Sequence, residues 1–341
     1  MSNALHGLDR PHSPFYYLFY KIVFVCVLLG AIGLLVFATA SLEYTWRWHR
    51  VPQYFWATGH NEIRSDMAAS VAGIEKREST TIVRLEPLDS GDSGEQLSLP
   101  ADATLRVTEG EDLYTGDVIA EIRFSKPGIL LEGLWVTVQV SAFAIAFGIF
   151  IGLITGLWRL SGNPALRWSA ITYIEIIRGS PLLVQIFLWY FVAGYLIDGL
   201  LQQMGLSPLP PLWYGVIALA IFTGAYVAEI VRAGIQSVHR GQMEAARSLG
   251  MSHGQAMRKV ILPQAFRRIM PPLAGQFISL IKDSSLLGVM AVRELTKATR
   301  EAVTSSLQSL ELWFTCALLY LVLTFTLSLF VQYLERRAVR R

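Results

Sequence analysis

Long uncharged blocks alternate with polar segments along this chain. The apolar blocks occupy residues 22–42, 133–158, 179–197, 199–228 and 312–334. Because about 20 apolar residues of helix cross a bilayer core of about 30 Å, each block is long enough to span a membrane once. A sixth span is expected at 269–292, where a polar cluster interrupts the apolar run. The pattern predicts an all-α polytopic membrane protein with one N-terminal span and then five more.

The first apolar block has two interpretations. A lysine precedes it, and Ala38-Thr39-Ala40 matches the small-x-small pattern of a secretory signal that is cleaved after Ala40. The apolar run is about twice as long as a compact signal core, which favours a retained anchor formed by residues 1–42. Either interpretation places residue 43 outside the cytoplasm.

The distribution of charge predicts the orientation of the spans. Segment 43–126 carries nine Lys/Arg and fifteen Asp/Glu, whereas 236–268 carries six Lys/Arg and a single glutamate. Short loops rich in Lys/Arg stay in the cytoplasm, so 236–268 and the arginine-rich C-terminus are expected inside. Alternating spans then place the acidic segment 43–127 outside the membrane.

Segment 43–127 is polar and contains no apolar block. A helix-like stretch is expected at 61–76, and short β-branched runs separated by Gly/Asp/Ser turns predict a small β-rich module over 79–124, with one turn at 89–94. Residues 99–122 resemble half of a barrel-sandwich hybrid of the lipoyl or biotinyl type. Those carriers need a lysine on a hairpin, and 78–125 contains none. The module is therefore expected to be an extracytoplasmic spacer or docking module.

Several kinds of chemistry are excluded by the residues present. Cys26 and Cys316 both lie inside apolar blocks, which leaves no disulfide framework and no CxxC metal site. All six histidines lie outside the blocks, so no intramembrane metal centre can be built on histidine. No lysine follows a glycine, so the end of a phosphate-binding loop is absent. The chain is expected to bind no cofactor and to be no enzyme.

The most specific motif lies at 236–263. Glu244-Ala245-Ala246 is followed three residues later by Gly250, and the segment closes with Val260 and Leu262-Pro263. The spacing predicts a helix that Gly250 ends in the left-handed conformation, and a second helix that Ser252 and Gln255 start as a capping box. Pro263 is expected to end that second helix. A basic loop lying on anionic lipid would explain the arginines but not this spacing.

This motif resembles the coupling-loop signature of binding-protein-dependent ABC importer permeases. The flanking segments 173–187, 225–250, 260–273 and 280–295 are similar to the polar amino-acid branch, the histidine/glutamine/glutamate type. The resemblance covers 128–338. Val260 stands where isoleucine is common, and Ser180 and Ser284 stand where threonine is common. The N-terminal anchor and the acidic module lie outside the usual pattern of the family.

The resemblance implies a type I permease core in the bacterial inner membrane, with five spans over 128–338 and a cytoplasmic C-terminus. It implies an ABC ATPase dimer that uses ATP and Mg, a second copy or a paralogous permease, and an extracytoplasmic amino-acid-binding protein. The resemblance also implies that the substrate is an amino acid and that the chain lies in a lipid bilayer. It implies no nucleic-acid partner. The residues expected to contact the ATPase are Gly241, Glu244, Ala245, Ala246, Gly250, Ser252, Val260, Leu262 and Pro263.

Polar residues within or beside the spans are candidates for the substrate pathway or a gate. Two pairs, Glu175 with Arg178 and Glu229 with Arg232, have a helical spacing of three, which also suits a structural ion pair. Pro181 predicts a kink. The full candidate set is Glu175, Arg178, Gly179, Ser180, Pro181, Gln185, Glu229, Arg232, Lys282, Asp283 and Ser284. The alternative class, a gated channel or secretion subunit, would need no ATPase-docking loop.

Overall fold

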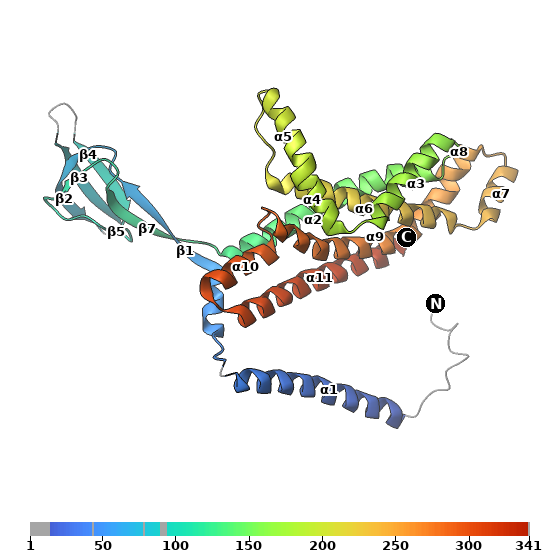
Figure 1. Ribbon diagram of the computed structural model, residues 1–341, viewed down its shortest axis with the longest axis horizontal. Coiled ribbons are helices and arrows are strands. Elements are labelled where there is room, and N and C mark those ends of the chain that lie inside the picture. The colour runs from blue at the N-terminus through green and yellow to red at the C-terminus, as the bar shows by residue number, and fades with distance from the viewer. Residues whose placement is uncertain (1–13, 43, 78, 89–93, 340–341) are drawn as a thin grey trace. The chain divides into compact units, whose positions relative to one another are not determined.

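The computed structural model describes residues 14–42, 44–77, 79–88 and 94–339 (Figure 1). The chain divides into two compact units, Met1–Trp48 and His49–Arg341. In the first unit, α1 (Pro14–Ser41) is a helix of 28 residues whose described side chains are almost all exposed. It is long and apolar enough to cross a membrane. The expected N-terminal helix is confirmed, and its retention as an anchor stays a prediction.

The second unit begins with a β module. A 3-10 turn at Trp48–Tyr54 leads into two antiparallel sheets, one with the strand order β1-β7-β5 and the other with the order β4-β3-β2-β6. The buried core takes apolar residues from both sheets, including Val71, Val83 and Ile119. The strands are β1 (Trp56–Arg64), β2 (Ala69–Lys76), β3 (Thr80–Pro87), β4 (Glu95–Pro100), β5 (Thr104–Leu105), β6 (Asp112–Leu113) and β7 (Val118–Pro127).

The prediction of a helix at 61–76 is wrong. These residues form the end of β1 and all of β2. Ala69 and Val71 are buried while Ser70 between them is less so, which is the alternation of a strand. Val71 pairs with Leu85 of β3, and such long-range pairing overrides a local preference for helix.

The module is also larger than the predicted 79–124. Strand β1 pairs with β7 from Trp56 opposite Pro127 to Arg64 opposite Val118, so both flanks belong to the sheet. Of the turn expected at 89–94, residues 89–93 lie outside the described residues.

The remainder of the second unit is helical. Its α-helices are α2 (Ile129–Arg159), α3 (Pro164–Gly179), α4 (Leu182–Phe187), α5 (Gly194–Gln203), α6 (Pro211–Gln236), α7 (Arg240–Ser248), α8 (His253–Ala256), α9 (Leu262–Asp283), α10 (Leu295–Ser306) and α11 (Ser309–Val339). A π turn joins α4 to α5, so Leu182–Gln203 is one helix of 22 residues. Within the described residues, five helices are long and apolar enough to cross a membrane: α1, α2, α4–α5, α6 and α11.

The sixth span expected at 269–292 is not among these five. Helix α9 carries Arg267 and Arg268 near its start and Lys282 near its end, which shortens its apolar stretch. The polar cluster ends the α-helix at Asp283 instead of interrupting it. A 3-10 turn at Ser284–Val289 follows, and the backbone is extended at Met290.

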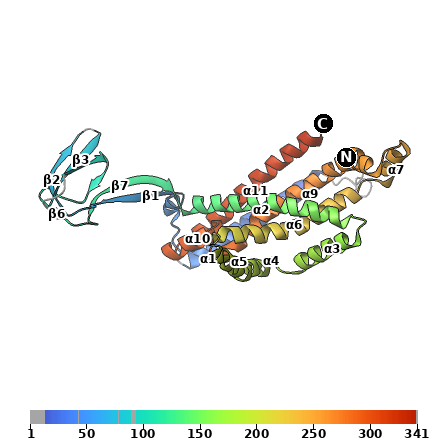
Figure 2. The same ribbon diagram turned by 90° about the horizontal axis from the view of Figure 1, so that it is seen from above.

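Helices α2 and α6 run side by side and form the centre of the bundle (Figure 2). Their contact is close because α2 presents Gly148, Gly152 and Gly156, four residues apart, to α6. A Cβ added to Gly152 would lie 2.5 Å from the Cβ of Val227 and 2.8 Å from the carbonyl oxygen of Gly224. Small residues at this spacing allow helices to approach closely inside a membrane, where no hydrophobic effect drives them together.

Candidate functional site

The segment 236–263 folds as a compact pair of helices between α6 and α9. The imidazole of His239 accepts a hydrogen bond from the backbone N–H of Gly241 at 3.1 Å and caps α7. Gly250 has φ +83°, the left-handed conformation expected for the residue that ends a helix. The N–H of Met251 donates to the carbonyl oxygen of Ala246, which satisfies one of the free carbonyls at the end of α7.

The start of the second helix is as predicted. The Ser252 hydroxyl accepts from the backbone N–H of Gln255 at 3.3 Å, and the Gln255 side chain accepts from the backbone N–H of Ser252 at 2.9 Å. This reciprocal arrangement is a complete capping box.

The prediction that the second helix ends at Pro263 is wrong. Helix α8 passes through a π turn at Met257–Ile261 directly into α9, and Pro263 lies in the first turn of α9. A proline inside a helix lacks one N–H donor and clashes with the carbonyl four residues earlier, here that of Lys259. The wider π turn at this point accommodates the proline, so α8 and α9 are continuous.

The two alanines of the motif have different surroundings. Ala246 is buried where α7 packs against α8 and the π turn, and Ala256 of α8 is buried as well. Ala245 and Glu244 are exposed, and Glu244 forms no hydrogen bond or ion pair with the described residues. Leu249 is 80% exposed beside them. One face of the pair therefore presents a carboxylate and apolar side chains that the chain itself leaves uncovered.

The rest of the helix pair is fixed to the bundle. Val238, Ile261 and Ala265 form a buried cluster in which Val260 is partly buried. The guanidinium of Arg268 donates to the carbonyl oxygen of Ser237 at the end of α6. Leu262 is 37% exposed, and Pro263 is exposed. The pair is thus attached both to α6 and to α9.

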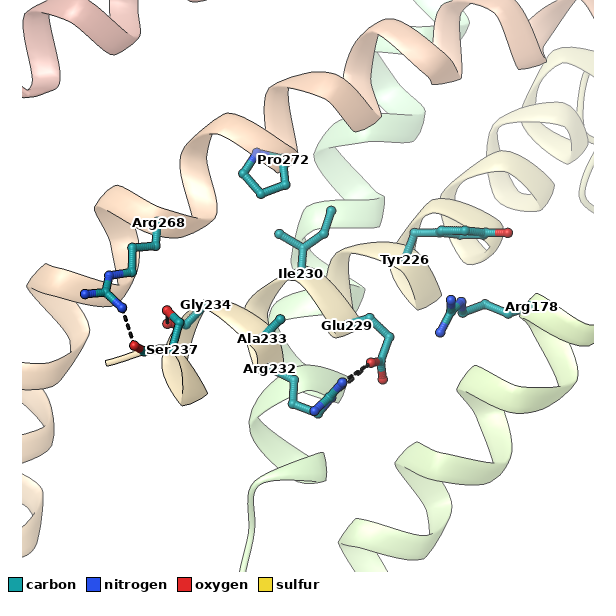
Figure 3. Close-up of a pocket in the computed structure, with 10 residues that line it drawn as sticks. All are labelled: Arg178, Tyr226, Glu229, Ile230, Arg232, Ala233, Gly234, Ser237, Arg268 and Pro272. Carbon is teal, nitrogen blue, oxygen red and sulfur yellow. Dashed lines mark hydrogen bonds and ion pairs between the residues drawn. The ribbon is translucent and has the colours of Figure 1, made fainter. Parts of the chain in front are cut away.

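A cavity of about 570 Å³ lies next to this attachment, between α3, α6 and α9 (Figure 3). Of the predicted pathway residues, Arg178, Glu229 and Arg232 line it. Glu229 and Arg232 form the expected ion pair at 2.7 Å, and Glu229 also lies 2.9 Å from Arg159 at the end of α2. Glu175 and Arg178 do not pair. The Arg178 guanidinium lies 5.3 Å from the centre of the Tyr226 ring instead.

The segment from Gly179 to Gln185 breaks the chain between α3 and α4, where a kink was expected. Helix α3 ends at Gly179, and Pro181 is extended before α4 begins at Leu182. The buried Gln185 side chain donates to the carbonyl oxygens of Ile177 at 2.7 Å and Ser180 at 3.1 Å. One side chain therefore holds both sides of the break together.

The cluster Lys282-Asp283-Ser284 lies at the opposite end of α9 from Arg268. Lys282 is exposed, Asp283 is partly buried, and Ser284 is fully buried, with its hydroxyl donating to the carbonyl oxygen of Ile281 at 2.7 Å. The structure therefore does not bring this cluster together with Glu229 and Arg232.

Sequence reasoning missed Arg159 and Arg268, which lie beside the cavity or line it, and Glu294, which lies near the other end of α2. The charge pattern places Arg268 in the basic segment 236–268 and does not single out Arg159, because one-dimensional charge does not show which arginine reaches another helix. Glu294 was not singled out. It is fully buried at the start of α10, where its carboxylate accepts from the N–H groups of Thr296 and Lys297 and from the Tyr320 hydroxyl at 2.7–2.9 Å. No local sequence pattern indicates that burial.

Comparison with known proteins places this geometry in context. A family model described as "Binding-protein-dependent transport system inner membrane component" matches residues 148–340. The probable glutamine ABC transporter permease protein GlnM of Bacillus subtilis (strain 168) is 40% identical over 219 residues, which cover 63% of this chain and 96% of the relative. The glutamine transport system permease protein GlnP of Escherichia coli (strain K12) is 38% identical over 209 residues, 61% of this chain and 92% of that protein.

A solved structure is similar over the same share of the chain. It is described as an amino acid ABC transporter with histidines, and it superimposes with a TM-score of 0.55 at 41% identity. The match covers 61% of this chain and 94% of that one.

Proposed function

Because the chain belongs to the family of binding-protein-dependent transport system inner membrane components, we propose that it is the permease subunit of an ABC importer that carries a polar amino acid into the cell. Two relatives are named for glutamine transport, and the similar solved structure is described with histidines. These three descriptions support the polar amino-acid class of substrate. The subunit itself is non-catalytic.

The proposal rests on the exposed face of the coupling pair, which is the helix pair α7 and α8 within 236–263. Glu244, Ala245 and Leu249 lie on a short helix that is fixed on its other side to α6 and α9. Because Glu244 has no partner among the described residues, its carboxylate is free to meet a cation on another chain. We assign this face to the groove of a partner ATPase, which uses ATP and Mg and moves the pair.

The continuous helix from α8 into α9 supports transmission of that movement. A displacement of α7 and α8 is passed to α9 without a flexible joint, because the π turn keeps the backbone helical. The break between α3 and α4 is a second point at which we expect helices to move, with the Gln185 side chain holding the two helices together. We assign the gate to this break and to Lys282-Asp283-Ser284, where α9 ends.

The remaining partners and the orientation follow from the same function. The basic coupling segment and the C-terminus lie in the cytoplasm by the positive-inside rule, and the acidic β module lies outside the inner membrane. There it meets an amino-acid-binding protein. A second copy of the chain or a paralogous permease completes the passage, because one bundle of this size cannot enclose it.

The test is uptake by the full chain reconstituted in vesicles with its co-purified ATPase and binding protein. We expect ATP-dependent accumulation of one or more members of a panel of radiolabelled polar amino acids. We expect Glu244→Lys to abolish uptake and to weaken co-purification of the ATPase. The substitution should leave the fold intact, because the Glu244 side chain is exposed and has no partner among the described residues. The matched control is Glu95→Lys, the same charge reversal at an exposed residue of β4, which retains the co-purified ATPase.

Two outcomes would contradict the proposal. Normal uptake by Glu244→Lys would remove the coupling role of this face. Equilibration of the amino acid without any ATPase would indicate a channel instead of an importer.

A further inference from the structure

Glu294 carries a carboxylate that is completely buried at the start of α10. Its oxygens accept hydrogen bonds from the backbone N–H groups of Thr296 at 2.8 Å and Lys297 at 2.7 Å, and from the Tyr320 hydroxyl of α11 at 2.9 Å. No ion pair involves Glu294 within the described part of the chain. Since a buried charge is costly unless hydrogen bonds compensate it, this carboxylate depends on α10 and α11 keeping their arrangement.

The same carboxylate lies against the 3-10 turn that follows α9. A Cβ added to Gly288 of this turn would overlap the Oε1 atom of Glu294, so the carboxylate occupies the space of the missing side chain. Two further side chains of α10 hold the turn. The Lys297 ammonium donates to the carbonyl oxygen of Met290 at 2.8 Å, and the Arg300 guanidinium donates to that of Gly288 at 2.7 Å. We call Glu294, Lys297 and Arg300 the α10 clamp.

Helix α10 is itself fixed to the bundle, where it packs against α2 and α11 (Figure 1). The backbone N–H of Leu295 donates to the Thr137 hydroxyl of α2 at 3.1 Å. A Cβ added to Gly133, one turn earlier on α2, would lie 2.7 Å from the Cβ of Ala298. The α10 clamp therefore ties the turn after α9 to helices that are held in place by contacts of their own.

We propose that Glu294 is a positioning residue for the gate at Lys282-Asp283-Ser284. The inference deepens the transport function proposed above and rests on it. Asp283 is the last residue of α9, and the turn held by the α10 clamp begins at Ser284. The clamp thus keeps the gate closed while the ATPase is idle, and movement of the coupling pair releases the gate through α9.

Helix α9 connects the coupling pair with the gate. Its 22 residues extend over about 33 Å, with α8 continuing into its first turn and the turn held by the α10 clamp following its last residue. A displacement of the coupling pair therefore reaches the gate through one helix. An apolar side chain at position 294 would fill the same space, but only a carboxylate with directed hydrogen bonds specifies one arrangement of α10, α11 and the turn.

The first test is transport by the full chain reconstituted in vesicles with its co-purified ATPase and binding protein. The probe is the radiolabelled amino acid that the wild-type chain takes up fastest among glutamine, glutamate and histidine. We expect Glu294→Gln to lower the amount taken up per ATP hydrolysed at least threefold. We also expect it to release the preloaded amino acid from the vesicles without ATP, because the loosened gate opens on its own.

A second variant keeps the test decisive if Glu294→Gln does not fold. Tyr320→Phe retains the ring and removes only the hydroxyl, so it should shift both readouts in the same direction by a smaller factor. The double variant should behave like Glu294→Gln alone if the two residues act through one hydrogen bond. The matched controls are Glu301→Gln, 37% exposed on the same helix, and Tyr333→Phe, 59% exposed on α11, and both should transport like the wild-type chain.

The second test needs no partner chain. Hydrogen exchange of the purified full chain in nanodiscs measures the opening of the turn at 284–290. We expect Glu294→Gln to exchange at least tenfold faster there and to leave α7 and α8 unchanged, since the coupling pair is attached to the other end of α9. Glu301→Gln should exchange like the wild-type chain.

Each result has a defined meaning. Faster exchange in the turn, together with less uptake per ATP and release without ATP, supports the proposal. Wild-type uptake per ATP and no release by Glu294→Gln overturn it and leave the transport function standing, even where the turn exchanges faster. Absence of uptake by the wild-type chain overturns the transport function and the gate with it. Unchanged exchange in the turn overturns the α10 clamp in either case.

Discussion

The carboxylate of Glu229 on α6 lies 2.9 Å from the guanidinium of Arg159, the last residue of α2. The same carboxylate lies 2.7 Å from Arg232 one turn later on α6. The side chains are 16–31% exposed, so solvent screens these pairs less than it screens a surface pair. One glutamate therefore fastens the two central helices together at the end that leads to the coupling pair.

We predict that Glu229→Gln destabilises the bundle. The neutral amide leaves Arg159 and Arg232 adjacent without a counter-charge, which costs on the order of 1–3 kcal/mol, between the values for exposed and buried pairs. Thermal unfolding of the full chain in detergent measures the change. Glu175→Gln, which removes the charge of an exposed and unpaired glutamate, should unfold at the wild-type temperature. Equal behaviour of the two variants would show that the pairs add nothing to stability.

The close approach of α2 and α6 gives a second prediction. Gly152→Ala places a methyl group 2.5 Å from the Cβ of Val227 and 2.8 Å from the backbone of Gly224, so the helices must separate. Such overpacking costs about 1–3 kcal/mol. Gly275→Ala in α9 is the matched control, because nothing lies within 4 Å of its Cβ position. Denaturant titration should show a loss of stability for Gly152→Ala alone. A stable Gly152→Ala would mean that this helix contact is looser than described.

The features that local chemistry determines could be predicted from the sequence. The left-handed Gly250 and the Ser252–Gln255 capping box each depend on a few adjacent residues, and both are present. Long apolar helices follow from composition in the same way, as for α2 and α6.

The features that depend on distant partners could not be predicted. Residues 61–76 are strands only because β7 and β3 lie beside them. Pro263 stays inside a helix because a π turn precedes it, and no pattern in the sequence marks that turn. Arg159 and Arg268 gain their positions from helices that are far away in the sequence. The spacing of Glu229 and Arg232 did indicate their pair, since both lie on one helix.

The glycine between the coupling helices gives a third prediction. Gly250 has φ +83°, where a side chain costs about 1–2 kcal/mol, so Gly250→Ala should loosen the end of α7. Hydrogen exchange should be faster across α7 and α8 and unchanged in α2. Gly254→Ala, at a helical position with open space around it, should leave exchange unchanged or slower. Identical exchange in both variants would argue against a strained turn at Gly250.

The β module offers a test of docking to a binding protein. Ser65 and the start of β7 are adjacent, since the N–H of Ser65 donates to the carbonyl oxygen of Asp117 at 2.8 Å and the N–H of Gly116 donates to that of Ser65 at 2.7 Å. Residues 66–115 can therefore be removed and Ser65 joined to Gly116 while β1 and β7 stay paired.

We expect this deletion to raise the concentration of binding protein needed for half-maximal uptake roughly tenfold, because the charged module no longer attracts it. The difference should shrink at high salt, which screens attraction between exposed charges. ATPase activity without binding protein is the control and should not change. Uptake with unchanged concentration dependence would leave the module as a spacer.

The last prediction concerns pH and the sheet β1-β7-β5. The pKa of the Glu121 carboxyl is lowered, chiefly because it accepts hydrogen bonds from the Arg106 guanidinium at 2.9 and 3.3 Å, with smaller effects of the charges of His60 and Arg123. A carboxyl whose pKa is lower in the folded than in the unfolded state stabilises the fold above its unfolded pKa. That contribution is lost as the pH falls through the folded value.

Acidification should therefore make hydrogen exchange faster in β5 and β7, which pair at Thr104 opposite Glu121. The measured rates are first corrected for the pH dependence of the intrinsic exchange rate. Arg106→Gln removes the donor that lowers the pKa, so it should weaken this pH dependence. Arg84→Gln, which removes a pair with Glu75 in the other sheet, should retain it. If Arg106→Gln and the wild-type chain respond alike to acid, the pairing of Arg106 with Glu121 is not what couples this sheet to pH.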